Sequence, residues 1–395
     1  KIVDAIVKMD ADVVGLIEIE NHATDDALQF LVDGLNAVAG AGTYDYIPTG
    51  PIGGDAIKVA FIYQPASVFP VGNYAILDSS FDPLFLDDYN RPALAQTFAE
   101  HGTGGTFTAV INHLKSKGSD CNDVNDPDTG DGQGNCNITR TNAAIVLANW
   151  LATDPTGSGD ADFLIIGDLN SYAMEDPIMA LTDAGYTNLM DAYNGLYSYQ
   201  FQGQSGYLDH ALANANLTAQ VTGVAPWHIN SDEPVALDYN NYNQPELYNA
   251  DPYGSSDHDP VMVGLDLDRA TNADGCYVLA LEGSPFTGPA TVLSIGDPGY
   301  TSGVFQARRW GSSEGLSRMA CYEIHGTDER DVIVGGNSSD QLFGYGGDDV
   351  LVGLKGQDLF TGGTGADVMQ GNQGIDEVLD YEFGIDICNS IEIGC

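Results

Sequence analysis

Four short segments combine carboxylate, amide and imidazole side chains in patterns suited to hydrolytic chemistry. They are residues 16–20, 112–117, 168–170 and 256–260. Carboxylates supply hard oxygen ligands for Mg²⁺ or Mn²⁺, and a neutral histidine beside a carboxylate is a natural general base. Because each segment alone also has a plainer explanation, the inference depends on their combination.

Two of the segments lie at or near the ends of apolar runs that predict buried strands. Glu18 shares a strand face with Leu16 and Glu20, and burying a carboxylate costs on the order of several kcal/mol unless it is paired or bound to metal. Asp168 and Asn170 follow the run FLIIG and are expected to face one spot at the strand's carboxyl edge. Alternatively, Glu18 is a surface acid at the strand end, and Asp168 and Asn170 belong to an ordinary turn.

The other two segments carry histidines. His113 is followed by Lys115 and Lys117 in a chain with only 13 basic residues, and this local positive charge favours binding of a phosphate. His258 lies between two aspartates, and Asp209 in the run YLDH could hold its second ring nitrogen. The alternatives are a solvated loop and an Asp-rich turn.

Helices and short strands alternate around these segments. Strands are predicted at 12–19, 56–63, 105–112, 161–167 and 260–267, and helices at 1–8, 24–39, 139–151 and 177–184. This mixture predicts a layered α+β domain. Residues 269–325 are rich in Gly and Ser with short β runs, and we assign them no function.

Residues 326–379 repeat with a period of nine. Six units each have Gly first, Asp sixth and a large apolar residue eighth, which resembles the RTX nonapeptide of calcium-binding parallel β-rolls. Gly permits tight turns, and Asp supplies oxygen ligands for Ca²⁺. The first and last units depart from the Gly pattern, so their ion sites are in doubt. The expected calcium ligands are Asp331, Asp340, Asp349, Asp358, Asp367 and Asp376, and the expected core residues are Ile333, Leu342, Leu351, Phe360, Met369 and Val378.

The charge balance is strongly acidic, with 57 acidic against 13 basic residues and a net charge of −44. This excludes a generic basic nucleic-acid binder. It suits a salty medium or calcium loading, and a simply acidic, soluble surface accounts for it equally well. No run of about 18 apolar residues predicts a membrane span, and the first residues show no secretory signal but begin in a helical pattern, which suggests a processed fragment.

Six cysteines fall into three sequential pairs. Proximity predicts disulfides Cys121–Cys136, Cys276–Cys321 and Cys388–Cys395, although many connectivities are formally allowed and free thiols are the alternative. Disulfides together with calcium repeats favour an extracellular or cell-surface location. The RTX resemblance also implies export by a type I-like route.

Taken in order, the motifs GLxE, NHLKSK, GDLN, LDH and SDHDP resemble the endonuclease/exonuclease/phosphatase superfamily, and the HLKSK form resembles its secreted bacterial nucleases. The resemblance covers about residues 1–266. It implies a four-layer α/β/β/α sandwich with the site at one end. We therefore expect a catalytic domain at 1–268, the Gly/Ser-rich region at 269–325, a β-roll at 326–379 and a C-terminal cap at 380–395.

The resemblance also implies roles for the catalytic residues. Glu18 resembles a metal ligand and Asp257 an acid near the metal, which is expected to be Mg²⁺ or Mn²⁺. Asp168 and Asn170 resemble the pair that orients water and phosphate. His258 resembles the general base, with Asp209 as the acid that orients it.

The same resemblance implies how the substrate is held. His113 resembles the histidine that donates a hydrogen bond to the phosphate. The further phosphate contacts expected are Arg91, Lys115, Lys117 and Tyr63. The family's first strand carries an Asn that would precede residue 1, so we expect the chain as given to be weakened or inactive, although its parent would be active.

The predicted function is metal-dependent hydrolysis of phosphodiester bonds in extracellular nucleic acid, most directly DNA. One alternative is another phosphoesterase of the same fold, which the HLKSK segment and the absence of an apolar membrane-entering hairpin disfavour. The other is a non-catalytic calcium-binding adhesin or matrix protein, which would have no need of the catalytic set.

Overall fold

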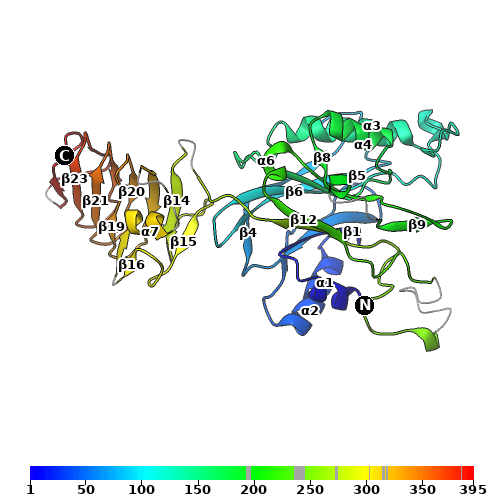
Figure 1. The fold of residues 1–395 in the computed structure, drawn as a ribbon, viewed down its shortest axis with the longest axis horizontal. Helices are drawn as coiled ribbons and strands as arrows, with labels where there is room; N and C mark the ends of the chain where they lie inside the picture. The colour runs from blue at the N-terminus through cyan, green and yellow to red at the C-terminus, as the bar shows by residue number, and fades with distance from the viewer. Residues whose placement is uncertain are drawn as a thin grey trace. The chain divides into compact units, whose positions relative to one another are not determined.

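The chain divides into two compact units (Figure 1). The first comprises Lys1–Ala99 and Phe107–Asp266, and the second Glu100–Thr106 and Leu267–Cys395. The part of the chain described contains no helix that is both long and apolar enough to cross a bilayer. The computed structural model describes residues 1–192, 197–234, 245–271, 275–301, 303–313, 316, 319–383 and 385–395.

The first unit contains the predicted helices and strands, with bounds that differ by a few residues. Its helices are α1 (Ile2–Met9), α2 (Asp26–Ala39), η1 (Asn122–Val124), α3 (Asn137–Leu151), α4 (Asp176–Asp183), α5 (Leu189–Ala192), α6 (Ala215–Thr218) and η3 (Pro245–Leu247). Its strands are β1 (Val13–Glu20), β2 (Asp45–Tyr46), β3 (Ile57–Tyr63), β4 (Val68–Leu77), β5 (Arg91–Glu100), β6 (Thr106–His113), β7 (Phe163–Asp168), β8 (Thr187–Asn188), β9 (Tyr199–Phe201), β10 (Gln204–Gly206), β11 (Asp209–Ala213), β12 (Val221–Pro226) and β13 (Val261–Leu265).

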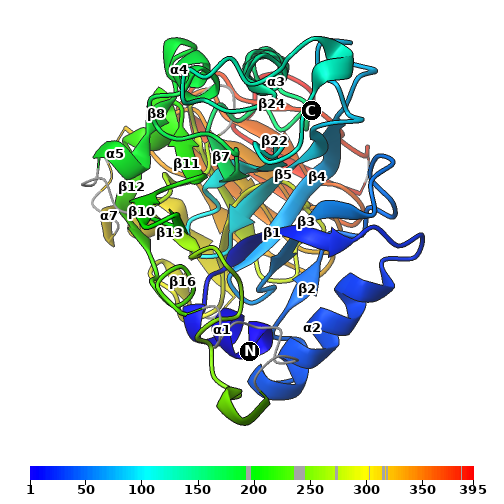
Figure 2. The same cartoon turned by 90° about the vertical axis from the view of Figure 1, so that its right-hand side faces the viewer.

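These elements form a four-layer α/β/β/α sandwich, as predicted (Figures 1 and 2). Helices α1 and α2 cover the sheet β1-β3-β2. Leu28 and Leu35 of α2, two turns apart on the same helical face, are fully buried against it. Helices α3 and α4 cover the larger sheet β4-β5-β6-β7-β11-β8. The sheets meet closely at Gly15, where an added Cβ would lie 2.8 Å from the side chains of Ile111 and Ile166.

The order of strands in the larger sheet decides where the functional segments meet. Strands β6 and β7 are parallel and end side by side, with His113 opposite Asp168. Strand β11 is antiparallel to β7 and begins with Asp209, also opposite Asp168. One edge of the sheet therefore collects the ends of three strands that are far apart in the sequence.

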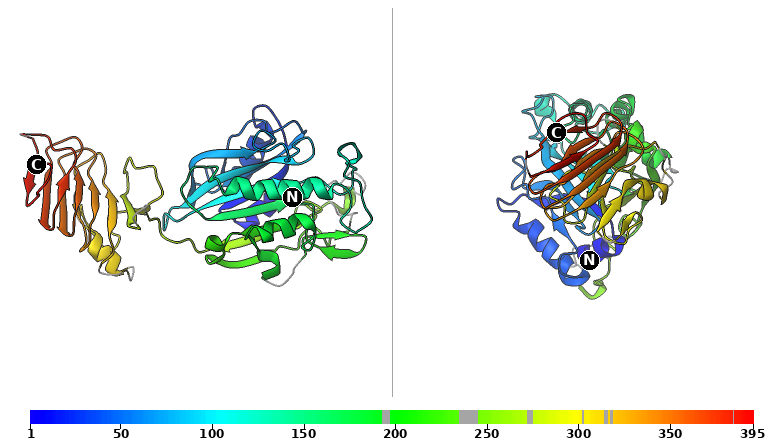
Figure 3. Two further views of the ribbon diagram at one scale, coloured as in Figure 1. Left: turned by 90° about the horizontal axis from the view of Figure 1, so that it is seen from above. Right: turned by 90° about the vertical axis from the view of Figure 1, so that its left-hand side faces the viewer.

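The second unit is a roll built from two six-stranded sheets, and its strands follow one another toward the C-terminus (Figure 3). One sheet contains β14 (Tyr277–Leu281), β15 (Thr291–Leu293), β18 (Tyr322–His325), β20 (Gln341–Phe343), β22 (Leu359–Thr361) and β24 (Glu377–Val378). The other contains β16 (Tyr300–Thr301), β17 (Val304–Gln306), β19 (Val332–Val334), β21 (Val350–Lys355), β23 (Val368–Gln373) and β25 (Ile387–Asn389).

Alternate nonapeptides lie in opposite sheets of this roll. Val332 pairs in parallel with Val350, and Val350 with Val368, so one full turn takes two nonapeptides. The eighth residues of the repeats are all buried and form one core, as predicted. Residues 277–306 contribute β14 to β17 to the same two sheets, so part of the region without an assigned function extends the roll. Helix α7 (Ala307–Ser313) packs Trp310 on this core.

All three predicted disulfides are present, joining Cys121 to Cys136, Cys276 to Cys321 and Cys388 to Cys395. The first closes the loop between β6 and α3. The second ties the start of β14 to the start of β18, beside the hydrogen bond from Tyr277 N–H to the Cys321 carbonyl. The third closes the C-terminal segment after the repeats.

Candidate active site

His258 and Asp209 form a half-buried acid–imidazole pair at the sheet edge. His258 Nδ1 lies 2.7 Å from Asp209 Oδ2, and Ser198 Oγ donates a 2.7 Å hydrogen bond to the same oxygen. Tyr199 stacks on the His258 ring at 4.5 Å. Burial opposes protonation of His258, but the hydrogen bond and charge of Asp209 outweigh it and raise the pKa of His258 to about 9.

Asp168 and Asn170 lie next to this pair and are bonded to each other. Asn170 Nδ2 donates to Asp168 Oδ2 at 2.9 Å, and its backbone N–H donates to Oδ1 at 2.7 Å. Burial first, then the charges of Asp209 and Glu18, raise the pKa of Asp168 to about 7. The amide is held against the carboxylate by these bonds and not by strand alternation, because β7 ends at Asp168 and Asn170 has a φ of 48°.

His113 and Arg91 bring hydrogen-bond donors to the same edge. Arg91 Nη1 lies 3.4 Å from His113 Nε2, and Arg91 Nε donates to Asp55 Oδ2 at 2.8 Å. His113 is buried, and burial, reinforced by the charges of Arg91 and His258, lowers its pKa to about 3. Its ring is therefore neutral at physiological pH and offers a hydrogen bond without charge.

Glu18 approaches from the smaller sheet, but not as the regular strand predicted. A bulge between Leu16 and Ile19 interrupts the pairing of β1 with β3, and Glu18 has a φ of 58°. Its side chain is 66% exposed instead of buried, with Oε1 4.0 Å from His113 Nε2. The bulge redirects this carboxylate toward the edge that carries His113 and Asp168.

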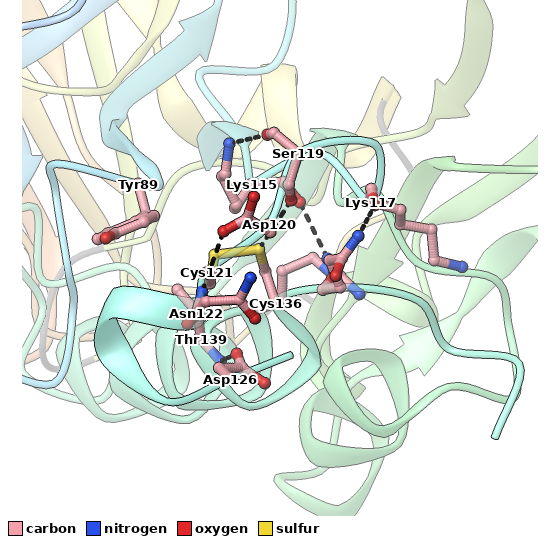
Figure 4. Close-up of a disulfide and its surroundings, with 12 residues drawn as sticks. Tyr89, Lys115, Lys117, Ser119, Asp120, Cys121, Asn122, Asp126, Cys136 and Thr139 are labelled. Carbon is pink, nitrogen blue, oxygen red and sulfur yellow. Dashed lines mark hydrogen bonds between the residues drawn. A yellow bond between two sulfur atoms is a disulfide. The ribbon is translucent and has the colours of Figure 1, made fainter. Parts of the chain in front are cut away.

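The two lysines of HLKSK already have partners. Lys115 donates to Ser119 Oγ (Figure 4). Lys117 pairs with Glu175 and lies 4.4 Å from the centre of the Tyr172 ring. Burial lowers the pKa of both lysines. Because an ammonium group has three donors, both can still contact a phosphate.

Tyr63 lies elsewhere, which corrects its prediction as a phosphate contact. It pairs with Val13 at one end of the β1–β3 ladder, whereas Glu20 pairs with Ile57 at the other. Six residues of strand separate Tyr63 from that end, or about 20 Å. Its ring packs on Phe98 at 5.7 Å between the two sheets.

Comparison with known protein families agrees with this geometry. The model of the Endonuclease/Exonuclease/phosphatase family matches residues 1–258. The chain belongs to this family. The RTX calcium-binding nonapeptide repeat matches residues 325–360 and 344–378. No curated protein matches the chain.

Solved structures also resemble this chain over part of its length. A mannosyl-6-phosphatase of Bacteroides thetaiotaomicron is 16% identical, with a TM-score of 0.46, and the match covers 67% of this chain and 89% of that one. TDP2 of D. rerio, complexed with a single-strand DNA product, is 15% identical, with a TM-score of 0.40 and coverages of 65% and 86%. The human Nocturnin catalytic domain, with bound sulfate, is 14% identical, with a TM-score of 0.37 and coverages of 56% and 73%.

Members of this family generally depend on a divalent metal, and the donors at this edge suit one by their chemistry. The charges of Asp209 and Glu18 both raise the pKa of the buried Asp168 carboxyl, so the three carboxylates lie close enough to repel one another. A cation beside them would relieve that repulsion, and carboxylate oxygens are the ligands that Mg²⁺ prefers. Within the described ranges, no three His, Cys, Asp or Glu side chains converge on one point, and Glu18 and Asp257 are both exposed.

Some residues that build this family site were missed in the sequence. Ser198 and Tyr199 hold the acid–imidazole pair from β9 and the residue before it, and no local pattern marks them. Asp259 belongs to the SDHDP motif, yet its role is visible only in the fold. It accepts hydrogen bonds from the backbone of Asn230 and from the side chain of Ser231, and it pairs with His228 at 2.9 Å. This fixes the loop beside His258.

The repeats contain a second set of buried acids, suited to calcium. Asp331 Oδ2 accepts the backbone N–H of Thr327, and Asp340 Oδ2 that of Gly336. The matching Oδ2 atoms of the next four repeats are buried and have no hydrogen-bond partner among the described residues, and a cation would satisfy them. The last repeat, whose ion site was in doubt, therefore has an unpaired Oδ2 atom like the middle repeats. In the first two repeats this atom is already hydrogen-bonded. These four residues are Asp349, Asp358, Asp367 and Asp376.

Proposed function

We propose that the first unit is a divalent-metal-dependent nuclease that hydrolyses phosphodiester bonds of extracellular nucleic acid, with DNA as the expected substrate. The observation that carries the proposal is the His258–Asp209 pair beside the Asp168–Asn170 pair and His113. RTX repeats are typical of secreted proteins, and the three disulfides suit the same surroundings.

His258 is the proposed general base. Asp209 holds Nδ1, which leaves Nε2 to take a proton from the attacking water. With a pKa of about 9 the ring is protonated at neutral pH, whereas a base must be neutral. Glu18 and Asp257 would hold a divalent cation, whose positive charge would offset that of the phosphate and would lower the pKa of nearby groups.

The other residues orient the reactants. Asp168 and Asn170 are locked together and present a carboxylate and an amide to the water and the phosphate. His113 donates to a phosphate oxygen as a neutral ring, and Arg91 adds a charged donor beside it. In a strongly acidic chain, these hydrogen-bond donors thus lie together at the edge where the phosphodiester is proposed to bind.

Incubation of the protein in its full natural length with plasmid DNA and Mg²⁺ tests the proposal. We expect nicked and linear DNA, no cleavage after EDTA, and a loss of about 10²–10⁴-fold in rate for His258→Ala. His325→Ala is the matched control, because His325 also pairs with a carboxylate, at 2.9 Å, and stacks on an aromatic ring, at 3.7 Å, but lies in the second unit. It should retain activity. An inert wild type would refute the nuclease, and full activity in His258→Ala would refute the base.

Small substrates separate the nuclease from the other phosphoesterases of the fold. We expect bis(p-nitrophenyl) phosphate to be hydrolysed at least tenfold faster than p-nitrophenyl phosphate, since the proposed site binds a diester. Faster hydrolysis of the monoester than of the diester would indicate a phosphomonoesterase. Faster hydrolysis of phospholipid vesicles than of DNA would indicate a phospholipid-cleaving enzyme. Either result would contradict the proposed substrate. Hydrolysis of none of these would favour the adhesin.

A further inference from the structure

Arg140 is a buried cation that the proposed mechanism does not use. It lies in the first turn of α3 and is 0% exposed. Its hydrogen bonds all end on neutral oxygens, and burying such a charge costs free energy. The acceptors are the carbonyls of Lys115 (3.2 Å), Asn135 (2.7 Å) and Gln133 (3.0 Å), and the hydroxyl of Ser171 (3.1 Å).

Two of these carbonyls, those of Gln133 and Asn135, lie within one closed loop, and that of Lys115 precedes it. A disulfide between Cys121 and Cys136 closes it, with both residues fully buried (Figure 4). The guanidinium joins the carbonyl of Lys115, before the disulfide, to that of Asn135, next to its second cysteine. Asn135 Nδ2 in turn donates to the carbonyl of Lys117 at 3.1 Å. The backbone of both lysines is therefore fixed from the protein interior.

The same guanidinium reaches the segment that carries the acid–amide pair. Its Nε–H donates to the hydroxyl of Ser171, the residue after Asn170. Asn170 Nδ2 donates to the carbonyl of Leu114 at 3.1 Å, next to Lys115. Two adjacent bridges thus tie the lysine segment to the catalytic segment.

We propose that Arg140 is a positioning residue that presents Lys115 and Lys117 to the phosphates flanking the scissile one. It rests on the nuclease function proposed above. Because these lysines contact substrate away from the reacting bond, Arg140 sets affinity more than the chemical step. A lysine at position 140 would keep the charge, but a single ammonium cannot span four separate acceptors.

Arg140→Lys in the full chain, loaded with Mg²⁺, tests this on a DNA duplex of fixed length. We expect KM to rise about tenfold with kcat within about threefold, the pattern of lost uniform binding. The slope of log(kcat/KM) against log[salt] should become shallower by about one unit for each lysine withdrawn from a phosphate. Fluorescence anisotropy of the same duplex in EDTA should show the same change in affinity and slope without cleavage.

A double-mutant cycle separates positioning from general destabilisation. In the Lys115→Ala/Lys117→Ala background, Arg140→Lys should change KM no further, because it acts through those side chains. Trp150→Leu, in the last turn of the same helix, is the control. It should lower Tm while leaving KM and the salt slope at wild-type values, since Trp150 is buried in the helix–sheet core.

The outcomes are distinct. Unchanged KM and salt slope in Arg140→Lys, or effects that add fully to those of the lysine variant, would overturn the proposal. Should Arg140→Lys fail to fold, Asn135→Ala removes only the bridge to Lys117, and an unchanged KM there would overturn it as well. If the wild type cleaves no DNA, the nuclease function fails, and the anisotropy arm still decides whether Arg140 controls binding through the lysines.

Discussion

The two clusters of acidic side chains in this protein are built in opposite ways. In the first unit, Glu18, Asp168 and Asp209 come from three strands and have different partners and different exposure. In the second unit, Asp349 and Asp367 occupy equivalent positions, with the N–H of one donating to the Oδ1 of the other 18 residues later. One cluster is specified by tertiary contacts and the other by a short repeated motif.

This difference has a physical consequence for how each cluster tolerates change. Removing one acid from the roll removes one of several similar sites, because each turn repeats the last. Removing one acid from the active site removes a role that no other residue fills. Single substitutions in the active site should therefore have the larger effects on reaction rate. Changes in calcium concentration and pH should have the larger effects on the stability of the roll.

The largest effect is expected for Asp209→Asn. The amide cannot hold the imidazole as the carboxylate does, so kcat should fall by about 10²–10⁴-fold, as for the loss of the base. Asp209 also raises the pKa of His258, so the rising limb of the pH–rate profile should move to lower pH in the variant. Steady-state kinetics between pH 5 and about 9 would measure both.

Asp232→Asn is the control for this variant, because Asp232 is an exposed acid that bonds Tyr197 outside the pair. It should leave both kcat and the position of the limb unchanged. A pH profile in Asp209→Asn that coincides with that of the wild type would contradict the assigned pair.

The sequence predicted the roll almost residue by residue and the active site only in part. The repeats encode turn, ligand and core within nine residues, so no distant contact is needed. His113 and Asp168 were predictable because both end apolar strands. The bulge at Glu18, by contrast, arises from pairing between β1 and β3, which the local alternation does not reveal.

Contacts over long sequence separations explain the other differences. Tyr63 ends a strand, as expected, but which end of the sandwich it occupies depends on antiparallel pairing with Val13. Arg140 carried a usable signal. It is one of only 13 basic residues, and it lies in the first turn of a helix that begins directly after Cys136. Tyr199 carried none, because its partner His258 is distant in the sequence.

Calcium removal should act on the roll and spare the first unit. With EGTA in excess Mg²⁺, we expect tail peptides over 326–379 to lose protection in hydrogen–deuterium exchange, because ligand binding stabilises the folded state by about 2.7 kcal/mol per site at 100 times Kd. Peptides from β6 and β7 should keep their protection. An equal loss of protection in both units, or no loss in either, would contradict the view that the two acidic clusters are built independently.

Proton binding should partly replace calcium in the roll. Burial raises the pKa of Asp340 and Asp349 to about 7 and that of Asp358 to about 6, from 3.8. Because these folded-state values exceed the unfolded one, their contribution to stability is complete below about pH 4 and is lost as pH rises through 6 to 7. The calcium-free tail should therefore melt at lower temperature at pH 7.5 than at pH 5.

Thermal melts followed by circular dichroism would measure this, with the calcium-dependent transition assigned to the tail. Adding calcium at pH 7.5 should restore the transition, since the ion takes the place of the protons. If the calcium-free tail were more stable at pH 7.5 than at pH 5, burial would not be raising the pKa of these carboxylates, and the prediction would be wrong.

The smallest effect separates two aspartates within the roll itself. Asp349 Oδ2 is buried without a partner, whereas Asp331 Oδ2 accepts hydrogen bonds from the backbone and hydroxyl of Thr327. Asp349→Asn should therefore weaken calcium binding, lowering the stoichiometry measured by isothermal titration calorimetry. Asp331→Asn should leave the stoichiometry unchanged and cost about 1 kcal/mol of stability through its hydrogen bonds. The two substitutions are chemically identical, so equal effects on calcium binding would mean that the ion sites follow the repeated sequence alone and not the partners each carboxylate finds in the fold.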